Sequence, residues 1–501
     1  MKSILHPSHL ALSTAQSPTL DEIFSYPERV LQFGTGVLLR GLPDFIIDQA
    51  NKAGHFKGRI VVVKSTSQGT SDAFDLQHGL YTVCVRGWEG AQAIEENHVV
   101  SSISRVLSAE KEWEAILSLA AQPELAILIS NTTEIGIQLI PEDVRNHVPS
   151  SFPGRVLAYL FARYQAFSGD PSKGMIIIPT ELISDNAKKL EHILLELAHL
   201  NHFDSAFIDW LETANSFCNS LVDRIVPGRP QGTLGSTIAA ELPYQDQLTI
   251  VAEPYALWAI EGDESLLDRL SFCRAGAGAS LHPSIEKFKE LKLRLLNGTH
   301  SITCGLAFLS GFQTVKEAMA DPDFARLIQQ VALEEIAPAI PSDQVTLVEA
   351  EQFAEQVLDR FRNPYLDHFW LSISLQYTQK LRMRLLPVLE YYVASRQEVP
   401  VLLSLGFAAY LHLMRVDSTA TGIFQGQPYQ IQDPMTAHFA EWYSQDADVV
   451  SAALRSTTLW GTDLTRIPGW EEAVREAYSW IQHQLDTQGI ITLSAFTLPQ
   501  I

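Results

Sequence analysis

The sequence predicts an α/β N-terminal domain over residues 1–283 and a mostly α-helical C-terminal domain over residues 284–501. In the first part, short apolar runs typical of buried strands alternate with amphipathic stretches, which indicates a parallel sheet with helices on its faces. Beyond Ser284, apolar residues recur at helical spacing over long stretches, and strand patterns are hard to find. A glycine turn between the first strand and the first helix narrows the α/β class further.

This turn is Gly34-Thr-Gly36, which follows a strand expected at Arg29–Phe33 and precedes a helix expected from Val37. Two glycines permit a tight turn and a close backbone approach, and the free amides of a helix start attract a pyrophosphate. The pattern indicates a Rossmann-type domain with a dinucleotide site. The residues expected to bind the cofactor here are Phe33, Gly34, Gly36 and Arg40.

Leu39 stands where a third glycine is usual, so a plain strand-to-helix turn is the alternative. A second strand at Arg59–Val63 follows at the spacing of a βαβ unit and favours the dinucleotide site. The residue after that strand is Lys64, where an acid that binds the adenosine ribose is usual, and Asp72 is the first carboxylate beyond it. The sequence therefore leaves the choice between NAD and NADP open.

Further strands are expected along the first domain, and they end in polar residues. The expected ranges are Leu80–Val85, Leu125–Ile129, Met175–Pro179, Leu248–Val251 and Ala256–Ile260. Thr133 and Glu134 come shortly after the strand at Leu125–Ile129, at the edge where open parallel sheets bind ligands, so we expect them to contact the cofactor. Ordinary turn chemistry explains such residues equally well.

Composition excludes several classes of protein. The formal net charge of -22 and a pI near 5.1 argue against nucleic acid or an anionic membrane as the main partner. An anionic small substrate would therefore need a local cluster of Arg and Lys. The four cysteines are scattered without zinc or disulfide spacing, and no signal peptide or membrane-spanning run is evident, so we expect a cytoplasmic protein without a metal. The sequence leaves the oligomeric state open, a monomer included.

The segment Lys292-Leu-Arg-Leu-Leu-Asn-Gly-Thr-His300 is the strongest candidate for chemistry. At about 100° per residue, Asn297 lies roughly 140° around a helix from Lys292, and His300 falls between them. Lys292 could move a proton, Asn297 could bind an oxyanion and His300 could orient a substrate oxygen. Gly298 inside this helix indicates that something approaches the backbone closely. A solvated helix edge with a buried histidine is the alternative.

The spacing of Lys292, Asn297 and His300 also resembles that of a known protein family. The Lys-x4-Asn-x2-His arrangement resembles that of the mannitol dehydrogenase family of polyol and sugar-acid dehydrogenases, and four blocks favour its uronate branch. The blocks are 32–40, 252–261, 292–300 and 360–365. The resemblance implies a metal-independent, NAD-linked reduction of a keto sugar acid, D-tagaturonate first, with D-fructuronate or the neutral ketose fructose as alternatives.

The resemblance also implies roles for particular residues. Lys292 would be the acid-base residue, Asn297 would bind the carbonyl oxygen and His300 would orient the reacting oxygen or a neighbouring hydroxyl. Asn186 matches the family's second amide donor, although an Asn at this place is also a common helix cap.

Three further residues are expected to bind the substrate. Asp223 and Arg224 lie in a segment that resembles the family's Val-Asp-Arg signature, although such an adjacent pair is also a plausible structural ion pair. Lys380 is the first candidate for the substrate carboxylate among five bases that cluster in the helical domain, and solvent exposure is the alternative for each of them. These bases are Arg360, Arg362, Lys380, Arg382 and Arg384.

Overall fold

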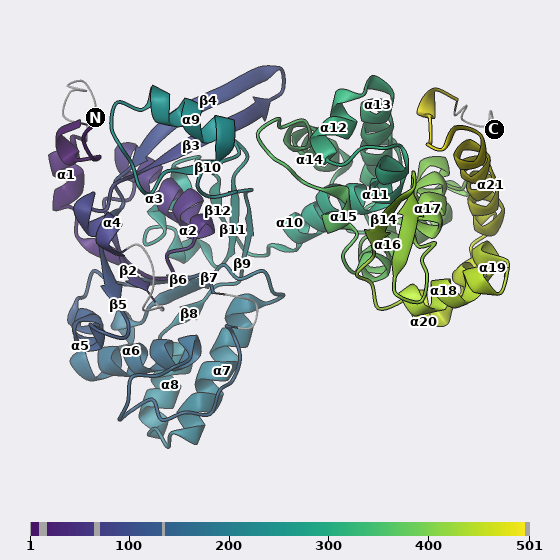
Figure 1. The fold of residues 1–501 in the computed structure, drawn as a ribbon. Helices are drawn as coiled ribbons and strands as arrows, with labels where there is room; N and C mark the ends of the chain where they lie inside the picture. The colour runs from purple at the N-terminus through teal and green to yellow at the C-terminus, as the bar shows by residue number, and fades with distance from the viewer. Residues whose placement is uncertain (1, 10–17, 65–70, 133–135, 496–501) are drawn as a thin grey trace. The chain divides into compact units, whose positions relative to one another are not determined.

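The computed structural model describes residues 2–9, 18–64, 71–132 and 136–495, and Thr133 and Glu134 therefore lie outside the described residues. The chain divides into two compact units (Figure 1). The sheet unit comprises Met1–Arg86 and Ile94–Ile285, and the helical unit comprises Gly87–Ala93 and Glu286–Ile501.

The sheet unit is built on a six-stranded parallel sheet with the strand order β5-β2-β1-β6-β7-β8. Its strands are β1 (Glu28–Phe33), β2 (Arg59–Lys64), β5 (Ile103–Ser108), β6 (Ile127–Ser130), β7 (Ile176–Pro179) and β8 (Ser216–Phe217). This is the doubly wound order, in which the direction of strand addition reverses between the first and fourth strands, here β1 and β6. The predicted Rossmann-type domain is confirmed.

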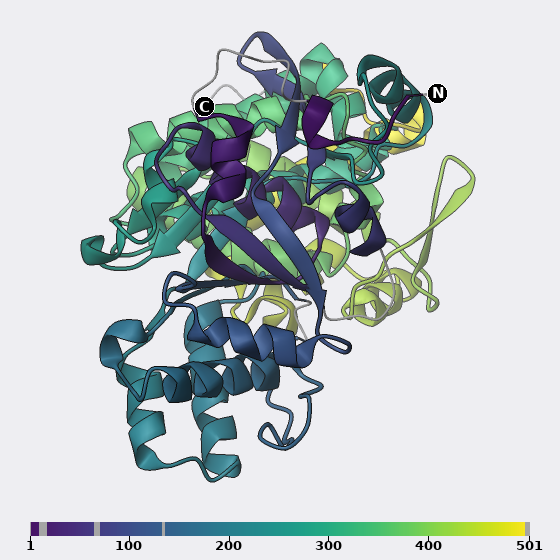
Figure 2. The ribbon, with the colours of Figure 1, turned by 90° about the vertical axis from the view of Figure 1, so that its left-hand side faces the viewer.

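Alternate residues of the central strands face two separate cores. Val30, Val62 and Ile129 face one core, whereas Leu31 and Val63 face the other, as a strand period of two requires. The second core is covered by α5–α8, the blue to teal helices below the sheet in Figure 2. The first core contains α3 and the smaller sheets β10-β3-β4 and β12-β11-β9.

The remaining elements of the sheet unit surround these cores. Its helices are α1 (Leu20–Ser25), α2 (Val37–Gly41), α3 (Pro43–Lys52), α4 (Ser71–Leu76), α5 (Trp113–Ser118), α6 (Phe152–Ala166), α7 (Asn186–Leu200), α8 (Ser205–Thr213) and α9 (Gly232–Glu241). Its other strands are β3 (Tyr81–Glu89) and β4 (Gln92–Val100), apart from their tip at Gly87–Ala93, together with β9 (Ser220–Asp223), β10 (Ile250–Ala252), β11 (Leu257–Glu261) and β12 (Ala279–His282).

The helix after the glycine turn is shorter than a Rossmann pattern predicts. It ends at Gly41, and a new helix, α3, begins at Pro43. A Cβ atom on Gly41 would lie 2.8 Å from Cγ2 of Val226. The close packing that a third motif glycine usually permits at position 39 is therefore provided by Gly41, two residues later.

The helical unit contains α10 (Glu286–Leu291), α11 (Thr299–Leu309), α12 (Val315–Ala320), α13 (Pro322–Gln330), α14 (Leu347–Phe361), α15 (Trp370–Ile373), α16 (Tyr377–Arg396), α17 (Val401–Leu413), α18 (Thr436–Ser444), α19 (Val449–Arg455), α20 (Thr457–Trp460) and α21 (Trp470–Gln488). π-Helices cover Lys292–Gly298 and Val331–Ile336. A hairpin of β13 (Thr421–Phe424) and β14 (Gln427–Gln430), which the sequence did not indicate, completes the unit.

Small residues fix α11 against α17. A Cβ on Gly305 would lie 2.9 Å from the backbone of Ala409, and a Cβ on Gly406 would lie 2.5 Å from the carbonyl oxygen of Ile302. The two helix backbones approach as closely as glycine permits. This crossing holds α11, and with it His300, in one place.

Candidate active site

The segment that carries Lys292 and Asn297 is a π-helix between α10 and α11. A π-helix closes hydrogen bonds between residues i and i+5, so residues five apart lie over one another. Lys292 and Asn297 are five apart and share one side of the turn. The separation of roughly 140° expected from α-helical geometry is therefore wrong, because the segment is wound more widely. Both side chains are half-buried.

Gly298 ends this π-helix, and its role is to admit another helix. A Cβ atom there would lie 3.2 Å from Cδ2 of Leu385 on α16. The close approach that the sequence indicated is thus made by a leucine side chain of the same unit. α16 packs against the π-helix at this point.

His300 is buried at the start of α11, with 7% of its surface exposed. Its ring stacks on Phe361 at a centroid distance of 3.9 Å and stands edge-on to His368 at 4.9 Å. Nε2 of His300 is buried and has no hydrogen-bond partner among the described residues. An unpaired buried polar atom costs free energy, so this is a place where a ligand could supply the missing partner.

The electrostatic surroundings keep His300 neutral. Burial, followed by His368 and Arg360, holds the pKa of His300 well below its usual value. A neutral imidazole has one donor and one acceptor nitrogen. His300 can therefore either donate a hydrogen bond to a substrate oxygen or accept one from a hydroxyl.

Arg384 of α16 holds the junction between the π-helix and α11. Its Nη1 donates to the carbonyl oxygen of Asn297 at 3.2 Å and to Oγ of Ser301 at 2.8 Å. Oγ of Ser301 in turn donates to the same carbonyl at 2.9 Å. Sequence reasoning placed Arg384 among the candidates for a carboxylate and missed Ser301, since no motif contains either contact.

Lys380 lies one helical turn before Arg384 on α16. Its Nζ donates to the carbonyl oxygen of Ile373 at 2.9 Å. Burial and then the neighbouring Arg384 lower the pKa of Lys380. His368, which sequence reasoning also missed, has its pKa lowered by burial and then by Lys380. Lys380, Arg384 and the buried Arg360 therefore form a cationic cluster around the neutral imidazole of His300, and Lys380 also acts on His368.

Of the two glycines in the turn of the sheet unit, Gly36 leaves open space and Gly34 does not. Gly34 has φ 120°, and a Cβ there would lie 2.9 Å from the carbonyl oxygen of Asn131, at the end of β6. A Cβ on Gly36 would meet no described atom within 4 Å, so a ligand can approach its backbone. The turn lies at the reversal of strand order, where sheets of this class bind ligands. It fits a dinucleotide.

The two other predicted cofactor residues of this turn point inward. Phe33 is fully buried and packs edge-on against Phe152 at 5.5 Å, so only its backbone is at the turn. Arg40 donates from Nη1 to the carbonyl oxygen of Leu248 at 2.7 Å and lies over the ring of Tyr81 at 5.5 Å. A direct cofactor contact of the Arg40 guanidinium stays a prediction.

Glu181, which the sequence did not single out, fixes the loop after β6. Its carboxylate accepts hydrogen bonds from Oγ of Ser130 at 3.1 Å and from the backbone amide of Thr132 at 2.8 Å. The loop thus leaves β6 in a fixed direction immediately before Thr133 and Glu134. The cofactor contacts predicted for these two residues remain predictions.

Asn186 is buried at the start of α7 and bonded to the main chain. Its Nδ2 donates to the carbonyl oxygens of Pro179 at 3.1 Å and Ser220 at 3.0 Å, and its Oδ1 accepts from the amide of Ser220 at 3.0 Å. This side chain ties the end of β7 to β9. Its predicted role as an oxyanion donor stays a prediction and would require one of these bonds to be exchanged.

Asp223 and Arg224 are buried at the end of β9. Arg224 donates from Nε to the carbonyl oxygen of Glu253 at 2.9 Å and from Nη1 to that of Gly41 at 2.7 Å. Burial lowers its pKa to about 10. The substrate contacts predicted for Asp223 and Arg224 likewise remain predictions.

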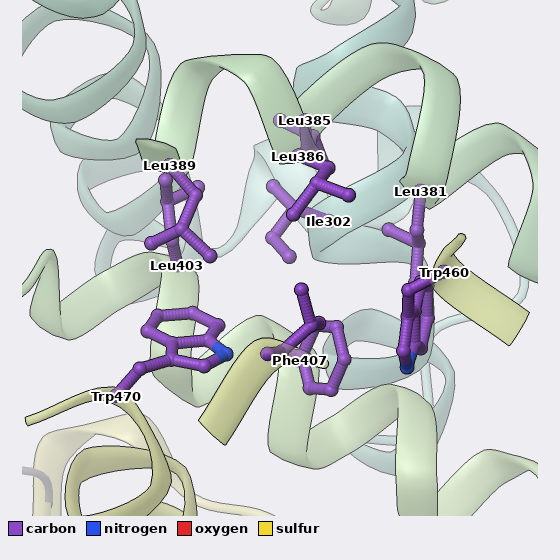
Figure 3. A pocket seen from close by; sticks show the side chains of 10 residues that line it. Ile302, Leu381, Leu385, Leu386, Leu389, Leu403, Phe407, Trp460 and Trp470 are labelled. Atoms are coloured by element: carbon purple, nitrogen blue, oxygen red, sulfur yellow. The ribbon is translucent and has the colours of Figure 1, made fainter. Parts of the chain in front are cut away.

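An apolar cavity in the core of the helical unit is not this site (Figure 3). It measures about 20 Å³ and is lined by leucine, isoleucine, phenylalanine and tryptophan side chains, among them Ile302 and Phe407. A polyhydroxylated acid needs more room and hydrogen-bond partners. Over the described ranges, no group of His, Cys, Asp or Glu side chains could hold a metal ion. Nor does any helix described there have the length and apolar composition to cross a membrane.

The parallel sheet with its strand-order reversal, followed by a helical unit with a Lys, Asn and His cluster, defines a two-domain dehydrogenase architecture. Two family models match it: the mannitol dehydrogenase Rossmann domain over residues 28–272 and the mannitol dehydrogenase C-terminal domain over residues 284–482. The chain belongs to the mannitol dehydrogenase family, and it is an oxidoreductase that acts on CH–OH groups of a polyol or sugar acid. The resemblance inferred from the sequence is confirmed.

Curated relatives are similar along nearly the whole chain. The altronate oxidoreductase of Bacillus subtilis (strain 168) is 37% identical over 473 residues, which cover 93% of this chain and 95% of the relative. That of Halalkalibacterium halodurans is 38% identical and covers 88% of each chain. That of Yersinia enterocolitica is 34% identical and covers 90% of this chain and 94% of the relative.

Solved structures show the same fold. A substrate-free D-sorbitol dehydrogenase superimposes with a TM-score of 0.78 at 20% identity, covering 97% of this chain and 99% of the other. Mannitol 2-dehydrogenase of Pseudomonas fluorescens, in a ternary complex with NAD and D-mannitol, gives a TM-score of 0.64 at 22% identity and covers 97% of each chain.

Proposed function

We propose that this protein catalyses the reversible, NAD(H)-dependent reduction of a keto sugar acid, D-tagaturonate to D-altronate. The observation that carries the proposal is the buried, unpartnered Nε2 of His300 beside the π-turn that presents Lys292 and Asn297. The altronate oxidoreductases among the relatives support the choice of sugar. Reduction of D-fructuronate, or interconversion of mannitol and fructose, is the alternative within the same family.

The glycine turn supports a nicotinamide dinucleotide as the cofactor. The backbone of residues 33–36 would hold it, because Gly36 leaves open space where a side chain would stand. The predicted contacts of Arg40, Thr133 and Glu134 belong to this proposal. When bound, the nicotinamide supplies or accepts the hydride. NAD is proposed as the cofactor. NADP is kept as the alternative, because no acid that could bind the adenosine ribose of NAD stands after β2 before Asp72.

The side chains of the helical unit would handle the proton and the oxygen. Lys292 gives a proton to the carbonyl oxygen during reduction and takes it from the hydroxyl during oxidation. The Asn297 amide donates a hydrogen bond to the same oxygen as charge develops there. His300, being neutral, orients that oxygen or the adjacent hydroxyl. Asn186, Asp223 and Arg224 are proposed as additional substrate contacts, and Lys380 as a contact to the carboxylate.

We also propose that residues 1–283 bind the cofactor and residues 284–501 supply the catalytic groups, in a cytoplasmic enzyme. Its partner would be a small sugar acid. No resident metal is needed in this scheme, because Lys292 and Asn297 provide the proton and the oxyanion contact.

A substrate panel tests the proposal. Purified protein is mixed with D-tagaturonate, D-fructuronate or D-fructose and with NADH or NADPH, and the loss of reduced-cofactor absorbance is followed. Turnover of D-tagaturonate with NADH at the highest kcat/KM is expected. Lys292→Ala, purified in parallel, should lose that activity. A wild-type protein that reduces D-fructose faster than either sugar acid would overturn the proposed substrate class.

A further inference from the structure

We propose that His368 and Lys380 form the subsite for the substrate carboxylate, and that His368 sets the preference for sugar acids over neutral sugars. The inference rests on the proposed function and adds to it the residue that selects the substrate class. Nothing in the sequence motifs pointed to His368, which lies in the segment between α14 and α15.

The first step is position. The ring of His368 stands perpendicular to that of His300, with centroids 4.9 Å apart. The main chain is fixed here, since the carbonyl oxygen of His368 accepts a hydrogen bond from the amide of Val315 at 2.9 Å. His368 is half-buried, whereas His300 is almost fully buried. A six-carbon acid that contacts Nε2 of His300 therefore has its other groups within reach of His368.

The second step is charge. The permanently charged groups that act most strongly on the His300 imidazole are all cations: Arg360, Arg384 and Lys380. This local excess of positive charge occurs in a chain whose formal net charge is -22. A bound carboxylate would compensate the mutual repulsion of these bases. A neutral polyol would leave that repulsion unchanged.

The third step concerns the carboxylates nearest in sequence, which have other partners. Asp367, adjacent to His368, forms an ion pair with Lys316 at 2.6 Å. Asp359 forms one with Arg362, three residues away. Each of these two acids therefore has a cationic partner outside the cluster around His300.

Lys380 is the second member because it can bind a ligand without losing its present contact. An ammonium has three donors, and the carbonyl oxygen of Ile373 takes one of them. Arg384 is less available, since its Nη1 is engaged by Asn297 and Ser301. The pair His368 and Lys380 thus offers donors to the two oxygens of a carboxylate.

The test compares the selectivity of His368→Gln and Lys380→Met with that of the wild type. The readout is the ratio of kcat/KM for D-tagaturonate to kcat/KM for D-fructose. Loss of a hydrogen bond to a charged group lowers this ratio about tenfold to a hundredfold, mainly through KM for the acid. His483→Gln, an exposed histidine of α21, is the matched control and should leave the ratio unchanged.

Equal losses on the acid and on fructose, or an unchanged ratio in both variants, would overturn the inference while the proposed function stood. A melting temperature within a few degrees of the wild type confirms that each variant is folded. If the wild type reduces no sugar acid, the proposed function fails. The carboxylate subsite is then tested separately, by measuring whether a sugar acid binds to the protein. D-Altronate should then raise the melting temperature of the wild type and fail to do so in His368→Gln; the same increase in both proteins would refute it.

Discussion

The polar side chains predicted to act in the sheet unit differ sharply from those in the helical unit. The side chains of Asn186 and Arg224 donate hydrogen bonds to main-chain carbonyl oxygens of neighbouring segments. In the helical unit, Nε2 of His300 is buried without a partner among the described residues, and the side chain of Asn297 lies half-exposed on the π-turn. The two sets look alike in the sequence and are engaged differently in the fold.

The difference follows from how the two units satisfy their backbones. Strands of a parallel sheet leave unpaired carbonyl and amide groups where they end, and polar side chains nearby must satisfy them. A continuous helix satisfies its own backbone, so its polar side chains remain available. The comparison predicts that the candidate residues of the helical unit are more available to a substrate than Asn186 and Arg224 are.

The largest effects are expected when Asn297 and Asn186 are each replaced by alanine. Asn297→Ala should lower kcat about 10²–10³-fold, as loss of an oxyanion donor does, with little change in melting temperature. Asn186→Ala should instead destabilise the protein by about 2–4 kcal/mol, because it leaves main-chain groups buried and unpaired. Steady-state kinetics and urea unfolding of both variants measure this contrast. A folded, stable Asn186→Ala enzyme with the larger loss of kcat would reverse the comparison.

The two motif glycines should separate stability from cofactor binding. Gly34→Ala places a Cβ 2.9 Å from the carbonyl oxygen of Asn131 at φ 120°, so it should cost about 1–3 kcal/mol of stability. Gly36→Ala meets no atom within 4 Å, so it should leave stability unchanged and raise KM for the cofactor. Urea unfolding and cofactor titration distinguish them. Equal destabilisation by both changes would contradict the open space that the structure shows at Gly36.

A smaller effect is expected from Arg384, which positions Asn297 through its carbonyl oxygen. Arg384→Met should lower kcat roughly tenfold, as loss of a hydrogen bond from a charged donor does, and Arg384→Lys should recover part of that loss. Arg382→Met, an exposed arginine on the same helix, serves as the control. A fall in kcat of the same size in both methionine variants would remove the positioning role.

The smallest effect is expected in the pH dependence of stability, to which His412 and Asp44 contribute with opposite signs. Burial lowers the pKa of His412, in the helical unit, to about 4, so its contribution to stability is lost as pH falls from about 6.5. Burial raises the pKa of Asp44, in the sheet unit, to about 7, so its contribution is lost as pH rises from about 4 to 7. Each amounts to about 1 kcal/mol between pH 5.5 and 6.5, with opposite signs.

Melting curves of His412→Gln and Asp44→Asn at these two pH values, each compared with the wild type, check the pair. His412→Gln should gain stability relative to the wild type as pH falls. Asp44→Asn should gain it as pH rises. Parallel curves for wild type and variant would show that the residue does not titrate in this window.

The fold was predictable where one physical pattern dominates. The largely buried strands β1 and β2, which lie on either side of the Gly34-Thr-Gly36 turn in the sequence, were found within one residue of their bounds. Strand β4 was missed, because most of its residues are exposed and it has no alternating apolar pattern. The π-helix was also missed, because the segment has the same apolar spacing as an α-helix and differs only in how its backbone is wound.

The sequence by itself determined the order of the two units and the strand that precedes the glycine turn. It also determined the lysine, asparagine and histidine of the candidate site. Only the tertiary structure decided which polar groups were already engaged. Arg384 reaches Asn297 across 87 residues, and Arg224 reaches Gly41 across 183. Local spacing contains no information about partners so far away in the chain, and a side chain is available for catalysis only when such partners have not taken it.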